Sequence, residues 1–74
     1  MTLTPAQKRL LLRMYLEGPR RMHRVGDLGF TCKPLSGLVQ KGYAEFTKRA
    51  SDRYWSGRLT SVGRREAALL IHQA

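Results

Sequence analysis

Residues 31–65 decide the fold, and they read TCKPLSGLVQKGYAEF (31–46), TKRASDR (47–53) and YWSGRLTSVGRR (54–65). Periodicity and turn residues predict a short helix, a strand, a charged loop, a second strand and a capped helix, in that order. We therefore expect an α+β fold in which a basic hairpin follows a helix closely.

The helix predicted over 31–41 has two unlike sides. Thr31 suits its N-cap, Pro34 falls in its first turn, and Gly42 ends it. Leu35, Leu38 and Val39 gather on one side. The other side, an arc of ~100°, holds Lys33, Ser36, Gly37 and Gln40. Lysine, serine and glutamine side chains can read base edges, and glycine allows close approach, although ordinary solvated residues would give the same pattern.

The hairpin that follows has a cationic loop. The two strands are expected at 43–46 and 54–59, with the side chains of Trp55 and Leu59 on one face. The loop between them, 47–53, carries Lys48, Arg49 and Arg53 against a single acid, Asp52. Such a tip can lie along phosphates or enter the minor groove, or it can serve solubility alone. Thr60 then caps a last helix over 61–72.

The segment before residue 31 predicts a helix from Pro5 to about residue 17. Thr4 and Gln7 have the spacing of a capping box, and Gly18-Pro19 is a stop signal. The inward face holds Leu10, Leu11, Met14 and Tyr15, while Leu12 and Leu16 widen the apolar arc toward either the core or a dimer contact. A basic connector follows, as a short strand or a turn, and a brief second helix over 24–28 ends at Gly29.

Size and charge bound the function. The 74 residues form one expected domain, 1–74, and 14 Lys and Arg against 5 Asp and Glu give a net charge of +9. That charge favours a polyanion: DNA, RNA or an acidic membrane surface. The single cysteine, Cys32, allows no intramolecular disulfide, and together with the absence of a secretory signal or membrane-spanning run it predicts a cytoplasmic protein with no membrane partner.

Catalytic chemistry is not indicated. The acids are scattered, His23 and His72 lie near opposite ends, and the glycines match no phosphate-binding loop. We therefore expect a protein that is not an enzyme, with no cofactor and no metal.

Segments 26–46 (GDLGFTCKPLSGLVQKGYAEF) and 54–70 (YWSGRLTSVGRREAALL) resemble the winged helix-turn-helix regulators, most closely those of the MarR kind. The matches are Asp27-Leu28, residues 38–43, and LTSVGR at 59–64, which is the most specific. The resemblance implies three to four helices with a small two- or three-stranded antiparallel wing. It also implies a small transcriptional regulator that binds double-stranded DNA by sequence, usually as a homodimer.

By that resemblance, the helix at 31–41 enters the major groove and the wing at 47–53 lies on the backbone or in the minor groove. The base-facing residues would be Thr31, Lys33, Ser36, Gly37 and Gln40. The backbone contacts would be Arg24, Lys41, Lys48, Arg49 and Arg53.

Two departures from the family are visible. The second helix is about one turn short, and the long dimerisation helices are missing, so a homodimer would have to use the first or the last helix alone. A reduced regulator of this kind suits a prokaryotic or phage-type, nucleoid-associated protein. The alternatives are an RNA-binding or ribonucleoprotein module, and a protein-interaction winged helix that uses Leu12, Leu16 and Ile71.

Overall fold

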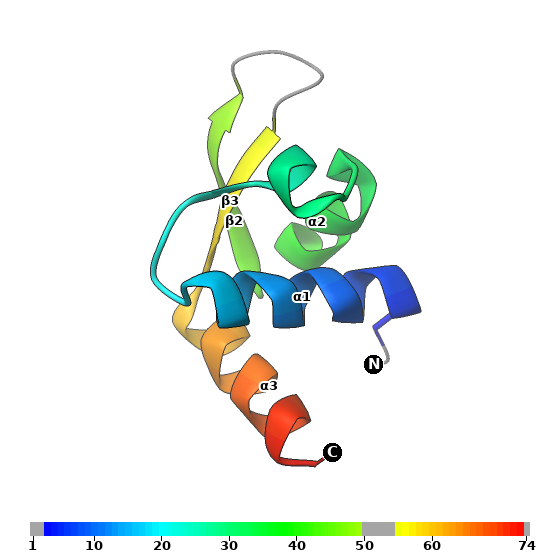
Figure 1. The fold of residues 1–74 in the computed structure, drawn as a ribbon, viewed down its shortest axis with the longest axis vertical. Helices are drawn as coiled ribbons and strands as arrows, with labels where there is room; N and C mark the ends of the chain where they lie inside the picture. The colour runs from blue at the N-terminus through cyan, green and yellow to red at the C-terminus, as the bar shows by residue number, and fades with distance from the viewer. Residues whose placement is uncertain (1–2, 50–54, 74) are drawn as a thin grey trace.

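The computed structural model describes residues 3–49 and 55–73, and within them the fold is α+β (Figure 1). Three α-helices accompany a three-stranded antiparallel sheet of order β1–β3–β2. The elements in chain order are α1 (Pro5–Glu17), β1 (His23–Arg24), the 3-10 helix η1 (Val25–Leu28), α2 (Cys32–Gln40), β2 (Ala44–Arg49), β3 (Trp55–Leu59) and α3 (Ser61–His72).

The capping box predicted for α1 is confirmed. The backbone N–H of Gln7 donates to Thr4 Oγ1 (3.2 Å), and the backbone N–H of Thr4 donates to Gln7 Oε1 (3.1 Å). These two bonds satisfy donors that a helix N-terminus otherwise leaves open. At the other end Gly18 adopts φ 153° as the C-cap, so both helix ends lie where local signals placed them.

The connector after α1 contains both a strand and a turn of helix. His23 and Arg24 pair with Gly57 and Ser56 of β3, which makes β1 an edge strand of the sheet. The next four residues form η1, which Gly29 closes in the left-handed region at φ 82°. The predicted second helix is therefore reduced to a short 3-10 segment, a form that is stable only in short pieces.

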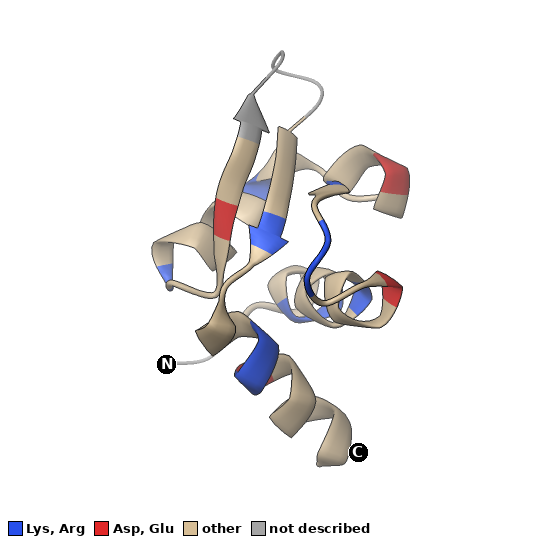
Figure 2. Cartoon of the chain, turned by 90° about the vertical axis from the view of Figure 1, so that its left-hand side faces the viewer, with Lys and Arg blue, Asp and Glu red and all other residues tan. Residues whose placement is uncertain are grey.

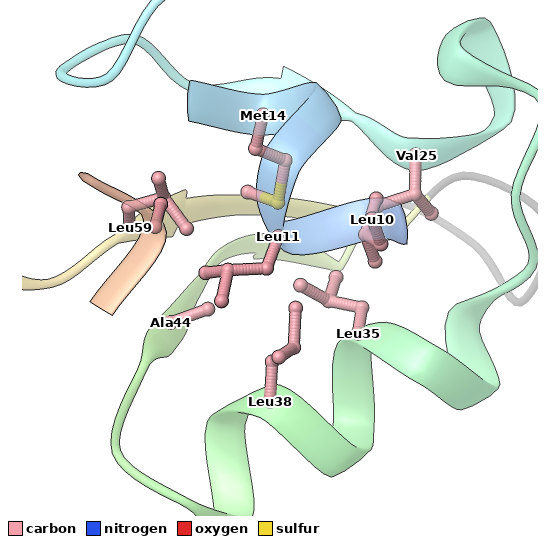
Figure 3. Packing of buried hydrophobic residues seen from close by; sticks show 9 residues of the cluster. Leu10, Leu11, Met14, Val25, Leu35, Leu38, Ala44 and Leu59 are labelled. Carbon is pink, nitrogen blue, oxygen red and sulfur yellow. The ribbon is translucent and has the colours of Figure 1, made fainter. Parts of the chain in front are cut away.

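A small apolar core lies between α1, α2 and one face of the sheet (Figure 3). Its largest fully buried side chains are Leu10, Leu11, Met14, Leu35, Leu38, Leu59 and Val25. The inward face predicted for α1 is confirmed, with Tyr15 packed against the edge of the core rather than inside it. Burial of each large aliphatic side chain contributes roughly 1.5–3 kcal/mol, so a few residues carry most of the stabilisation.

The hairpin β2–β3 is stabilised toward its loop end by aromatic packing. Phe46 and Trp55 meet edge-to-face with ring centroids 4.8 Å apart, a geometry that stabilises aromatic pairs. A register shift between Phe46 and Lys48 marks a bulge in β2, which increases the local twist of a strand. On the outer face Arg58 pairs with Glu45 at 2.6 Å.

Thr60 fixes the start of α3 against the end of α2. Its backbone N–H donates to the carbonyl of Tyr43 (3.1 Å), and its hydroxyl donates to the carbonyl of Gly42 (2.6 Å). The same hydroxyl accepts the Gly63 N–H at 3.0 Å, which confirms the predicted N-cap. Any Cβ at Gly63 would overlap the Tyr43 carbonyl, so only glycine lets the two backbones approach this closely.

Helix α3 packs through a narrower face than its apolar residues indicate. Gly63 and Ala67 are buried and Leu70 packs against the core, whereas Val62 and Leu69 are 53% and 50% exposed. The C-terminal part of α3 extends away from the other helices (Figure 1). The side of α3 that carries Val62 and Leu69 therefore faces solvent.

Gly63→Ala tests whether the contact with Tyr43 is obligatory. Alanine favours an exposed helix by about 1 kcal/mol over glycine, but here the Cβ must displace backbone, and overpacking costs typically about 1–3 kcal/mol. We expect a net loss of stability in urea unfolding. Gly26→Ala is the control, because a Cβ there meets nothing within 4 Å; equal stabilities of the two variants would contradict the obligatory contact.

Candidate nucleic-acid interface

The exposed side of α2 is a narrow polar arc. Pro34, Leu35 and Leu38 turn toward the core. At 100° per residue, Lys33, Ser36 and Gln40 fall within about 60° of one another on the opposite side. Lys33 and Gln40 are exposed and Ser36 is half-buried. An ammonium, a hydroxyl and an amide are therefore presented together to solvent by one rigid helix.

Gly37 does not belong to this arc. A Cβ at Gly37 would overlap the side-chain amide of Gln7, so α1 covers this side of α2. The placement expected from the helical pattern is thus wrong in one respect: the glycine allows α1 and α2 to pack closely, and it does not face outward with its neighbours. The helical pattern could not reveal this, because it contains no information about which helix packs beside position 37.

Of three further expected contact residues, two lie at the ends of α2 and one lies in the sheet. Thr31 is the N-cap residue as predicted, but its exposed side chain makes no capping hydrogen bond. Lys41 is the half-buried C-cap residue of α2, and Arg24 is exposed in the edge strand β1. Thr31 and Lys41 therefore flank the polar arc at the two ends of α2, whereas Arg24 belongs to the sheet.

The wing residues are described only in part. Lys48 and Arg49 belong to β2, where they pair with Ser56 and Trp55 of β3 in the half of the hairpin nearer its loop. Their side chains, and Arg53 altogether, lie outside the described residues. The hairpin base follows α2 directly through Gly42, whose φ of 80° reverses the chain.

A groove beside α2 adds cations that the sequence did not single out. It has a volume of about 740 Å³ and lies between α1, the η1–α2 connection and the first turn of α2. Arg9, Arg13 and Lys33 line it together with apolar Phe30 and other residues. Arg13 also pairs with Glu17 at 3.5 Å in an exposed i,i+4 contact. The only sequence signal was the i,i+4 spacing of Arg9 and Arg13 on α1.

The apolar residues expected at a protein contact separate into two groups. Leu16 is 70% exposed, but Leu12 packs against the core and Ile71 is half-buried. The other large hydrophobic side chains that are exposed on a helix, Val62 and Leu69, belong to α3. The three residues predicted to form one protein contact surface therefore differ in how far they are exposed to a partner.

Other kinds of site are not formed by the part of the chain that the structure describes. Its His, Cys, Asp and Glu residues form no group of three that could hold a metal ion, and none of its helices is long and apolar enough to cross a bilayer. Comparison of the chain with protein-family models, with curated proteins and with solved structures gives no match.

The contact between Gly37 and Gln7 can be measured with a double-mutant cycle. In the natural background, Gly37→Ala forces the Gln7 amide out of place and disturbs the capping box. When Gln7→Ala has opened the space, Gly37→Ala should stabilise α2 by about 1 kcal/mol through helix propensity. We therefore expect Gly37→Ala to be more favourable by about 1–3 kcal/mol in the Gln7→Ala background, from urea unfolding. Additive effects would show that α1 does not cover position 37.

Proposed function

We propose that this protein is a small winged-helix regulator that binds double-stranded DNA by sequence. Helix α2 enters the major groove, and the segment 47–53, which begins in the last residues of β2, lies along the backbone or in the minor groove. The observation that carries this proposal is the arc of Lys33, Ser36 and Gln40, which faces solvent directly opposite the buried side of α2. We assign the protein no catalytic role.

The length of α2 suits contact with only a few base pairs. Lys33 and Gln40 are seven residues apart, which is about 10 Å along a helix at 1.5 Å per residue. This separation corresponds to about three base pairs at 3.4 Å per step. Glutamine can bond adenine through both of its polar atoms, and lysine can reach guanine or a phosphate. Each copy of α2 would therefore read only a few base pairs.

The order of elements supports the same proposal. A helix that leads directly into a two-stranded hairpin, followed by a capped helix, is the order of a winged helix-turn-helix, and the +9 charge suits a polyanionic ligand. Leu16, Val62 and Leu69 are exposed apolar side chains on α1 and α3 through which two copies could associate. A homodimer would match a palindromic site.

Fluorescence anisotropy of a labelled random-sequence DNA duplex at two salt concentrations, with duplex RNA as competitor, tests the proposal. We expect binding that weakens steeply with salt, because phosphate contacts release counterions. Duplex RNA should compete poorly, since its major groove is too deep and narrow for α2. Preferential binding of RNA would favour the RNA-binding alternative, and no binding to either at low salt would favour a protein partner.

Gln40→Ala separates base reading from general attraction. On a duplex selected by the protein from a random pool, we expect a loss of about 1–3 kcal/mol in binding free energy, with little change on unselected DNA. Gln73→Ala is the matched control, because Gln73 is also exposed but caps the far end of α3. If Gln40→Ala lost equal affinity for selected and unselected duplexes, Gln40 would not be a base-contacting residue.

A further inference from the structure

A second basic surface lies at the start of α3. Here a shallow basin of about 420 Å³ is lined by Arg20, Arg58 and Arg64, together with Leu59, Thr60, Ser61 and a single acid, Glu45. The arginines come from three separate segments: the connector after α1, strand β3 and the first turn of α3. We call this surface the arginine basin.

The arginine basin has positive charge in excess. Arg58 is satisfied by Glu45, to whose Oε1 its Nε and Nη2 donate at 3.1 and 2.6 Å. Arg64 uses Nη1 to reach the Leu59 carbonyl at 3.1 Å, which holds the guanidinium over the basin and leaves its other N–H groups for a ligand. Arg20 is exposed, and no carboxylate of the described residues pairs with it.

The arginine basin and the polar arc of α2 (Lys33, Ser36 and Gln40) lie on opposite sides of the sheet. Ala44, Gly57 and Leu59 are buried on the inner face, where a Cβ at Gly57 would meet Leu35 of α2. Glu45 and Arg58 are exposed on the outer face. Figure 1 shows α2 on one side of the hairpin, and Figure 2 shows Lys and Arg spread over several elements rather than gathered near α2.

More than half of the 14 Lys and Arg residues lie outside the set expected to contact the first duplex. We propose that the arginine basin binds the phosphate backbone of a second DNA duplex, so that one protein molecule bridges two duplexes. This inference rests on the proposed function, which supplies the first duplex. Planar guanidinium groups bind phosphate oxygens in pairs, and the hydroxyl of Ser61 suits the same oxygens.

One duplex cannot serve both surfaces. The shorter dimensions of the molecule are 22 and 20 Å, so a duplex would have to reverse direction around a body no wider than itself. DNA is stiff over about 150 base pairs and resists such a turn. The arginine basin offers guanidinium and hydroxyl groups that suit phosphate oxygens, so contact there is independent of sequence.

A bead-bound duplex and a second, fluorescent duplex of unrelated sequence test this directly, with recovered fluorescence as the readout. Single-duplex affinity is measured in parallel by anisotropy. We expect Arg20→Glu to lower recovery at least about five-fold, while its single-duplex affinity stays within about two-fold of that of Arg21→Glu. Arg21→Glu is the matched control: it makes the same charge change at the next exposed residue, whose side chain packs over Gly18 outside the basin.

Ser61→Glu provides a second variant. It places a carboxylate in the arginine basin, while a negative charge at a helix N-terminus favours folding; it should lose bridging as Arg20→Glu does. Absence of single-duplex binding by the natural protein would overturn the proposed function and this inference with it. Single-duplex binding without bridging, or bridging that survives Arg20→Glu, would overturn the inference alone, as would an equal loss with Arg21→Glu.

Discussion

The arrangement of the molecule depends on the hydrogen bonds of one side chain and its backbone, those of Thr60. Its hydroxyl joins the carbonyl of Gly42 to the N–H of Gly63, and its own N–H binds the carbonyl of Tyr43. The exit of α2, the start of β2 and the start of α3 are thereby held at one point. Because buried backbone groups need partners, this junction also satisfies polar groups that would otherwise oppose the close packing.

The junction gives a physical reason for the LTSVGR segment. Leucine fills the core, threonine caps and ties, and glycine admits the Tyr43 carbonyl where a Cβ would overlap it. Arginine at position 64 opposes the helix dipole, but its guanidinium reaches back to the Leu59 carbonyl. The angle between α2 and the hairpin is therefore fixed by residues that lie away from the exposed arc of α2, and these residues set the direction in which that arc faces.

Local chemistry allowed much of the fold to be predicted. The Thr4–Gln7 capping box, the Thr60 cap and the glycines at 18, 29 and 42 mark element ends through interactions within a few residues, so the sequence contains them in full. The expectations that were incomplete concern contacts between elements. Gly37 was expected to face outward with its neighbours, but its packing depends on Gln7, a residue distant in sequence. The arginine basin was missed for the same reason, since its three cations come from separate segments.

On the proposed function, the energetics of base contacts limit how well one copy of the protein can discriminate between DNA sequences. Each well-placed contact discriminates by about 1–3 kcal/mol, and specific sites are typically about 4–10 kcal/mol better than random DNA. On the proposed function, Lys33, Ser36 and Gln40 include one amide and one cation suited to the strong contacts, so a single α2 would fall toward the lower end of that range. On the proposed function, two copies joined through the exposed apolar side chains of α3 would double the reading set. A single copy would hold two duplexes together, one through α2 and one through the arginine basin, with less discrimination between sequences than two copies would give. On the proposed function, the oligomeric state of the protein on DNA therefore distinguishes a regulator from an organiser of DNA.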